Sequence, residues 1–161
     1  MTQTIYMESL DELQDFYDGI ADDFNQIEFD PWMQAELGLM ADWHDGLFQS
    51  ATDPGGTPWP PLAPSTITRK GHSTILVDTG RLRQSLRLKG NQSTGDAVRE
   101  GIQSDLTSYM TFGTVVEYGP YHDQASGTRP ARRHVGINEE YMDRMTVRAC
   151  DFTIKELAEA G

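Results

Sequence analysis

The first 53 residues of this 161-residue chain contain no lysine and no arginine, although they contain 13 aspartates and glutamates. The rest of the chain carries 12 acidic and 13 basic side chains, so the net charge of -12 arises from the N-terminal third. Such a segment repels nucleic acid and favours basic protein partners. An acidic helix face that simply lies in water has the same composition, so both interpretations stay open.

Other absences limit the class of protein. Only one cysteine is present, Cys150, so no disulfide can form within the chain, which fits a reducing compartment. No apolar run approaches the roughly 18 residues of a membrane span. The N-terminus lacks the basic and then apolar pattern of a signal peptide. We therefore expect a soluble protein, made in a host cytoplasm, with no membrane partner and one domain over residues 1–161.

The acidic part, residues 1–51, is predicted to be helical after a short strand at residues 3–7. Ser9 and Glu12 have the spacing of a capping box. An apolar stripe follows at alternating spacings of three and four, at Leu10, Leu13, Tyr17, Ile20, Phe24 and Ile27. Burying six such side chains contributes about 9–18 kcal/mol, whereas ordering about 18 backbone units costs about 18–36 kcal/mol. The first helix must therefore pack on a second helix, on a sheet, or on a neighbouring subunit.

Asp30 is predicted to cap the second helix, with Pro31 at its first position. The apolar stripe of this helix contains Met33, Leu37, Met40, Leu47 and Phe48, with His44 between them. Residues 52–71 are dense in proline and glycine, which predicts a shaped loop. Trp59, in the middle of this loop, is the expected anchor, either in the chain's own core or on the next subunit.

The loop and sheet part spans residues 52–137. Asp78 or Thr79 is predicted to cap a short helix through Arg81, Leu82 and Leu86. Two β-rich runs follow, with Val98, Glu100 and Ile102 on one face and then residues 109–116, and Gly90, Asn91 and Gly95 are predicted to mark a hairpin-like turn between them. Asn138 begins a last helix, residues 138–161, with apolar positions at Met142, Met145, Ala149, Phe152, Ile154 and Leu157. The predicted class is α+β: two N-terminal helices, a Pro/Gly-rich loop, a small antiparallel sheet and a C-terminal helix.

The triplet Asp78, Thr79 and Gly80 after an apolar run is similar to the catalytic triplet of dimeric aspartic proteases, in which two aspartates share one proton. Arg81 opposes this interpretation, because a cation favours the ionised form of both aspartates. A turn that caps a helix is the competing interpretation.

The remaining candidate residues favour binding over catalysis. The four histidines lack the spacing of a zinc site and no cysteine or carboxylate cluster accompanies them, so neither a metal nor a cofactor is predicted. Tyr118 could stack on a base, but no stripe of basic residues accompanies it as on a nucleic-acid-binding surface, so core or interface packing is favoured. Arg129, Arg132 and Arg133 form a small basic cluster that meets phosphate or an acidic patch on a neighbour, and the acidic chain favours the second.

Two blocks carry a resemblance to a known family. The first block runs from Phe48 to Ser85 and contains a D-P-x-G-x-x-W-x-P-L element, a basic pair and an L-x-x-T-G-x-L-x-x-S element. Its matched residues are Asp53, Pro54, Gly56, Trp59, Pro61, Leu62, Thr66, Arg69, Lys70, Leu76, Thr79, Gly80, Leu82 and Ser85. The second block is matched at Gly113, Thr114, Tyr118, His122, Gln124, Gly127, Pro130, Ala131, Arg132 and Gly136. This chain departs from the family pattern at two places. Asp123 is inserted between His122 and Gln124, and Arg133 and His134 stand where the pattern usually has Pro-Phe. In these residues the chain resembles the virion morphogenesis, or tail-completion, family of Mu-like and related tailed bacteriophages.

The resemblance implies a non-enzymatic structural protein of the virion, at the head-tail junction or neck, that completes the tail or joins it to the head. It implies a homo-oligomeric ring, six-fold like the tail or twelve-fold like head connectors, with connector, neck or tail-tube proteins as partners and DNA only passing through the channel. The expected interface residues are Trp59, Arg81, Tyr118, His122, Arg129, Arg132 and Arg133. Asp22 and Asp23 are expected to face the channel or a basic partner. An aspartic-protease-like dimer using Asp78 and an assembly chaperone that leaves the virion are the alternatives.

Overall fold

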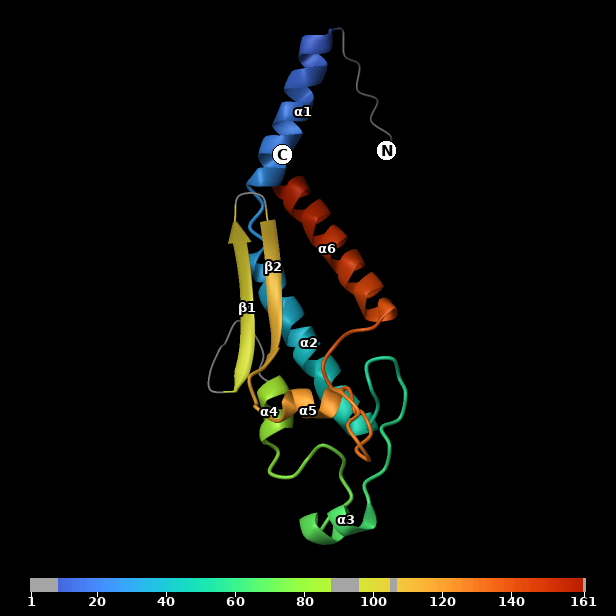
Figure 1. Ribbon diagram of the computed structural model, residues 1–161. Helices are drawn as coiled ribbons and strands as arrows, with labels where there is room; N and C mark the ends of the chain where they lie inside the picture. Colours follow the sequence, from blue (N-terminus) through green and yellow to red (C-terminus); the bar gives the residue numbers. More distant parts are fainter. Residues whose placement is uncertain (1–8, 88–95, 105–106, 161) are drawn as a thin grey trace.

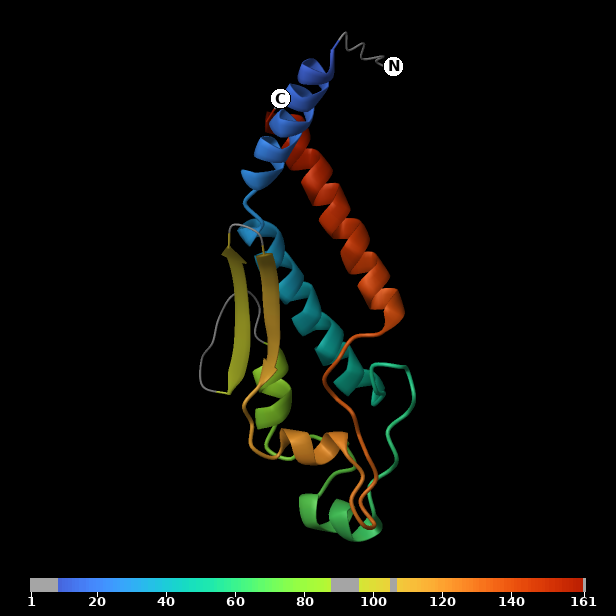
Figure 2. The ribbon, with the colours of Figure 1, turned by 45° about the horizontal axis from the view of Figure 1, so that its top comes forward.

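The computed structural model describes residues 9–87, 96–104 and 107–160 of the chain. One long helix, α2 (Asp30–Ser50), forms the axis of an elongated molecule, with a two-stranded sheet beside it and α6 (Glu139–Ala160) on its other side (Figure 1). α1 (Leu10–Asn25) extends from one end of α2, and α3 (Pro64–Lys70) lies at the opposite end in both ribbon views (Figures 1 and 2). α4 (Arg81–Arg87) and α5 (Gly119–Asp123) lie between α3 and the sheet. The described elements confirm the α+β class.

α1 begins as predicted, because the Glu12 backbone N–H donates to the Ser9 hydroxyl at 3.1 Å. No residue of this helix is buried, and its main contact is with α6. The base of α1 is nevertheless fixed. Ile27 is buried, and the Gln103 side chain donates to the Ile27 carbonyl at 2.7 Å. The ring of Phe29 lies 5.7 Å from that of Phe152 on α6. The helix is therefore a projecting arm with an attached base. The short strand predicted at residues 3–7 lies outside the described residues.

α2 starts differently from the prediction. Asp30 is its first helical residue, and Phe29 occupies the cap position without a side-chain hydrogen bond. The backbone of Phe29 is already in the α region, so its carbonyl accepts from the Met33 N–H at 2.9 Å and leaves Asp30 inside the first turn. The carboxylate of Asp30 still stabilises this end of the helix dipole. The predicted apolar stripe is confirmed, because Met33, Leu37, His44, Leu47 and Phe48 are buried and Met40 is half-buried.

The sheet packs along α2. Strand β1 (Ala97–Ser104) pairs antiparallel with β2 (Thr107–Thr114), with Ala97 opposite Thr114 and Ser104 opposite Thr107. The strands are therefore connected through residues 105–106, and the hairpin turn predicted at Gly90, Asn91 and Gly95 is wrong in position. Those three residues precede both strands and lie outside the described residues. The register of pairing, and not the glycine and asparagine pattern, decides which segment joins the two strands.

His44 joins α2 to the sheet and to a distant loop. Its ring stacks on Phe112 of β2 with centroids 4.4 Å apart. Its Nδ1–H donates to the Met40 carbonyl at 2.7 Å, and its Nε2 accepts from the Gly136 N–H at 3.1 Å. This pattern requires the neutral imidazole. Burial, only partly offset by the Met40 hydrogen bond, lowers the pKa of His44 from 6.5 to about 4.

A buried carboxylate attaches α6 to α2. Glu36 is 1% exposed and receives two hydrogen bonds from Arg148, at 2.6 and 2.8 Å, and one from the Tyr141 hydroxyl at 2.9 Å. α6 begins as predicted, with the Asn138 side chain accepting from the Tyr141 N–H. The predicted apolar face is wrong at Met142 and Ile154, which are exposed, because the helix turns Tyr141 and Arg148 toward Glu36 instead. Among the described helices, none is long and apolar enough to cross a bilayer.

Candidate functional site

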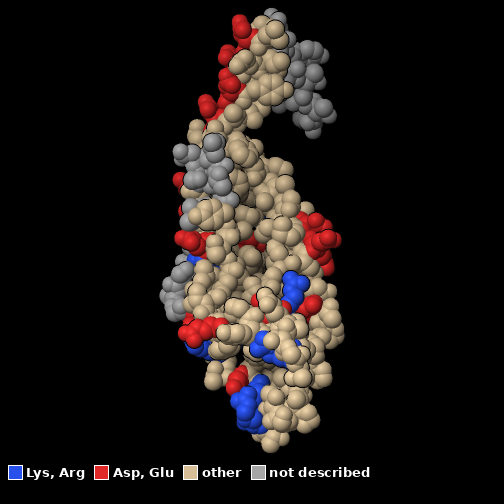
Figure 3. Space-filling view, viewed as in Figure 1, with Lys and Arg blue, Asp and Glu red and all other residues tan. Residues whose placement is uncertain are grey.

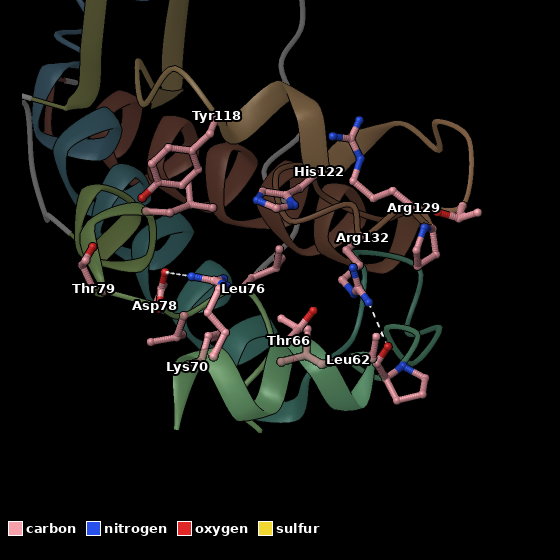
Figure 4. Close-up of a pocket in the computed structure, with 18 residues that line it drawn as sticks. Leu62, Thr66, Lys70, Leu76, Asp78, Thr79, Tyr118, His122, Arg129 and Arg132 are labelled. Atoms are coloured by element: carbon pink, nitrogen blue, oxygen red, sulfur yellow. Dashed lines mark hydrogen bonds and ion pairs between the residues drawn. The ribbon is translucent and has the colours of Figure 1, made fainter. Parts of the chain in front are cut away.

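A pocket of about 770 Å³ opens at the end of the molecule opposite α1 (Figure 4). One wall is α3 with the loop before it, a second is residues 76–80 with Leu82, and a third is formed by Tyr118, His122 and residues 128–132. Segments that are distant in the sequence thus meet around one hollow. Among the residues labelled in Figure 4, Asp78 lies on one side of it and His122 and Arg132 lie on the other.

Trp59 and Arg132 shape the loop that forms the first wall. Trp59 is 5% exposed, its ring lies 5.4 Å from that of Phe48, and its indole N–H donates to the Arg133 carbonyl at 2.8 Å. The Arg132 guanidinium donates to the Pro60 and Pro61 carbonyls at 2.9 and 3.0 Å. Trp59 is therefore anchored in the chain's own core, one of the two places that the sequence allowed, and Arg132 ties the loop to the opposite wall.

α3 corrects the prediction that residues 52–71 form only a loop. Pro64 stands in the first turn of this helix, and Gly71 ends it with a left-handed φ of 76°. Proline just inside a helix start and glycine just past its end is a recognisable signal, and it was present in the sequence. α3 brings Thr66, Arg69 and Lys70 to the pocket, and none of the three is among the interface residues predicted from the sequence.

The pocket lining is strongly basic. It contains four cations, Arg69, Lys70, Arg129 and Arg132, but only one carboxylate, that of Asp78. Arg69 approaches Asp78 at 3.6 Å. Within the described part of the chain no carboxylate forms an ion pair with the other three cations. Lys70 instead donates to a backbone carbonyl at 2.7 Å, and burial lowers the pKa of its ammonium group. An anionic group would therefore be attracted into this pocket.

Two polar atoms at the pocket lack partners. The Nδ1 of His122 and the Nε of Arg129 are buried without a hydrogen bond to any described residue. Burial lowers the pKa of His122, and the positive charges of neighbouring arginines act in the same direction. A buried polar group without a partner is uncommon in a folded protein and marks a place where a bound group completes the hydrogen bonding. An acceptor such as a carboxylate oxygen would satisfy the Arg129 Nε–H.

The wall residue Leu76 has a positive φ of 55°, which is strained for a branched side chain. Its side chain is directed at the pocket with that of Leu62 (Figure 4). The walls between the charged groups are therefore apolar, so the pocket suits a ligand that combines apolar and anionic groups.

Four predicted interface residues lie together at the pocket: Tyr118, His122, Arg129 and Arg132. The others do not. Arg81 pairs with Asp96 through two hydrogen bonds, one of them at 2.6 Å, which attaches the start of α4 beside β1. The Arg133 side chain is exposed outside the pocket.

The acidic candidates and the aspartate triplet also lie apart from one another. Asp22 and Asp23 are exposed on α1, which lies at the end of the molecule far from the pocket (Figure 1). Of the two proposed caps of α4, Thr79 accepts from the Arg81 N–H, although at a long 3.4 Å, whereas Asp78 is exposed and faces Arg69. Among the described residues, no group of three or more histidine, cysteine, aspartate or glutamate side chains has a geometry that would hold a metal ion.

The two sequence blocks that carry the family resemblance form one surface. Both contribute to the pocket lining, the first with Leu62, Thr66, Arg69, Lys70, Leu76 and Thr79 and the second with Tyr118, His122, Pro130 and Arg132. The two blocks are separated in the sequence by α4 and the sheet, and they meet in space because the chain folds back on itself after the sheet (Figure 1).

Comparisons with known proteins agree with this convergence. No match was found among curated proteins or among solved structures. A family model, described as the phage virion morphogenesis family, matches residues 10–149, which include α1, both motif blocks and the first half of α6. The chain therefore belongs to the phage virion morphogenesis family and has a role in assembling a phage virion.

Proposed function

We propose that this chain is a structural protein of the head-tail junction, which completes the tail or joins it to the head as a ring. The observation that carries the proposal is the arm. Leu10, Tyr17 and Phe24 on α1 are 83, 60 and 50% exposed, although they form the continuous apolar stripe of the helix. A helix cannot repay the cost of its ordering with an apolar face in water. The subunit is therefore incomplete by itself and needs a neighbour.

A ring supplies such a neighbour to every copy. In a closed ring each subunit meets the next through two different patches, so one end of the molecule contacts another part of its neighbour. The opposite charges at the two ends of this molecule support such a contact (Figure 3). We propose six copies, matching the symmetry of tails, with twelve as the alternative imposed by head connectors. The neighbours above and below are connector, neck or tail-tube proteins, and DNA passes through without sequence-specific binding.

We also propose that this role requires no catalysis and no cofactor. An aspartic-protease dyad needs two carboxylates that share a proton. Among the described residues, Asp78 pairs with the Arg69 guanidinium, and this positive charge favours the ionised carboxylate instead. The geometry at Asp78 thus supports a surface ion pair more than a catalytic dyad.

The test is the number of copies in finished particles. Virions of the phage that encodes the chain are purified, and the protein is counted by quantitative peptide mass spectrometry against the major capsid protein. Six or twelve copies, located at the junction by cryo-electron microscopy, are expected. Absence from the particle, with heads and tails failing to join when the protein is missing, would indicate a chaperone that leaves the virion. One copy per particle would exclude a ring.

A further inference from the structure

We propose that the α1 arm of one copy binds in the basic pocket of a second copy. This inference rests on the proposed function for its setting, since it supplies the contact between neighbouring subunits of a ring. Its evidence is the match between two surfaces of the same chain, a largely exposed apolar helix face and a pocket lined with cations.

The arm presents an apolar face on a helix whose charged side chains are all acidic. Leu10–Asn25 contains six aspartates and glutamates and no cation. Tyr17 and Ile20 of the apolar stripe are 60 and 45% exposed. Asp23 follows Ile20 by three residues and therefore borders the stripe on the helix surface. The other carboxylates lie mainly on the side opposite the stripe, as the red edge of α1 in Figure 3 shows.

The pocket matches the arm in charge and offers apolar surface between its charged groups. Its volume of about 770 Å³ lies in the range that encloses a ligand of several side chains. Leu62 and Leu76 provide apolar surface for side chains of the arm. Arg129 and Lys70 provide cations that form no ion pair with a described carboxylate. A carboxylate at the border of an inserted apolar face is the acceptor that the buried Nε of Arg129 lacks.

The arm of one molecule cannot enter its own pocket. α1 and α3 lie at opposite ends of the elongated chain in both ribbon views (Figures 1 and 2). The base of the arm is held by the hydrogen bond between Gln103 and Ile27 and by the contact between Phe29 and Phe152. Folding the arm back would break both contacts. The occupant must therefore come from another copy, and a contact between two different patches closes into a ring or continues as a filament.

Pairing of two arms is the less favourable use of the apolar stripe. Two α1 helices side by side would bring together twelve carboxylates with no cation between them, since each helix carries six. Like charges at this density oppose association in water, and the opposition is strongest at low salt. The arm-to-pocket contact has the reverse salt dependence, because it joins an anionic helix to a cationic pocket and weakens as salt screens the attraction.

Sedimentation of full-length variants tests the contact. The arm variant carries Tyr17→Ser and Ile20→Ser, and the pocket variant carries Arg129→Glu. These side chains are exposed or at the pocket surface, so the fold should be retained, which circular dichroism checks. The wild type should associate at high protein concentration, and each variant alone should associate at least about tenfold more weakly. A mixture of the two variants should form a 1:1 dimer, because one intact arm meets one intact pocket, and this dimer should not grow further.

Matched controls separate the contact from general surface effects. Tyr109→Ser removes an aromatic that is 50% exposed on β2, and Arg133→Glu reverses a cation outside the pocket; both should associate like the wild type. Arg129→Lys keeps the charge and should associate more strongly than Arg129→Glu. A wild type that stays monomeric, single variants that associate normally, or a mixture that stays monomeric would overturn the inference. These association measurements do not depend on the copy number in virions. If they contradict the contact between arm and pocket, the proposed location at the head-tail junction is still tested separately by that copy number.

Discussion

Replacing Trp59 with alanine removes the side chain that attaches the proline-rich loop to the core. The indole is 5% exposed, packs edge-on against Phe48, and donates to the Arg133 carbonyl at 2.8 Å. Deleting a buried tryptophan typically costs about 3–5 kcal/mol, because apolar contact is lost and a cavity remains. Trp59→Phe keeps most of the apolar contact but leaves the carbonyl without its donor, which costs about 1–3 kcal/mol. Trp59→Ala should therefore lower the free energy of unfolding more than Trp59→Phe does.

Chemical denaturation followed by far-ultraviolet circular dichroism measures both changes. Fluorescence is less suitable, because Trp32 and Trp43 also contribute. A lower midpoint with an unchanged slope indicates lost stability and not an altered unfolded state. Tyr118→Ala is the matched control, since this aromatic is 37% exposed at the pocket and should cost little. An alanine variant at Trp59 within about 1 kcal/mol of the wild type would refute the anchoring role.

Three further predictions concern charge. His44 is neutral in the folded chain and takes up a proton more readily when unfolded, so the free energy of unfolding should fall by roughly 3 kcal/mol as pH drops from 6.5 to 4. His44→Gln, measured in parallel, should lose this part of the pH dependence. If the free energy of unfolding of the wild type and of the variant fell equally with pH, the prediction would be contradicted. Asp78→Asn removes only an exposed ion pair with Arg69 and should change stability by less than about 1 kcal/mol; acid-pH cleavage of a peptide substrate that disappears in this variant would establish a protease instead. Replacing Asp22 and Asp23 with lysine should weaken ring assembly if Asp23 binds in the neighbouring pocket. Slowed DNA ejection from intact rings would instead indicate that the two residues face the channel, and failure of heads and tails to join with intact rings would indicate a docking role and exclude the channel.

Patterns confined to neighbouring residues predicted the local structure well. The Ser9 cap, the stripe of α2, the Asn138 cap and the two β-rich runs all have causes that act within a few residues, so the sequence contains the complete signal. The same type of signal, Pro64 followed by Gly71, marked α3 and was overlooked within a loop rich in proline. By contrast, the face of α6 could not be assigned from periodicity. A single buried carboxylate, Glu36 on another helix, turns Tyr141 and Arg148 inward.

The sequence by itself determined the acidic, cation-free N-terminal segment, the amphipathic nature of α1 and the motif blocks that carry the family resemblance. Only the tertiary structure decided where these features lie. It buries Trp59 in the chain's own core, leaves the α1 stripe exposed, and gathers Arg69, Lys70 and Arg132 around one pocket. The physical reason is that periodicity shows that a face is apolar but not what covers it, because the covering residues come from distant segments whose approach depends on the packing of the whole chain.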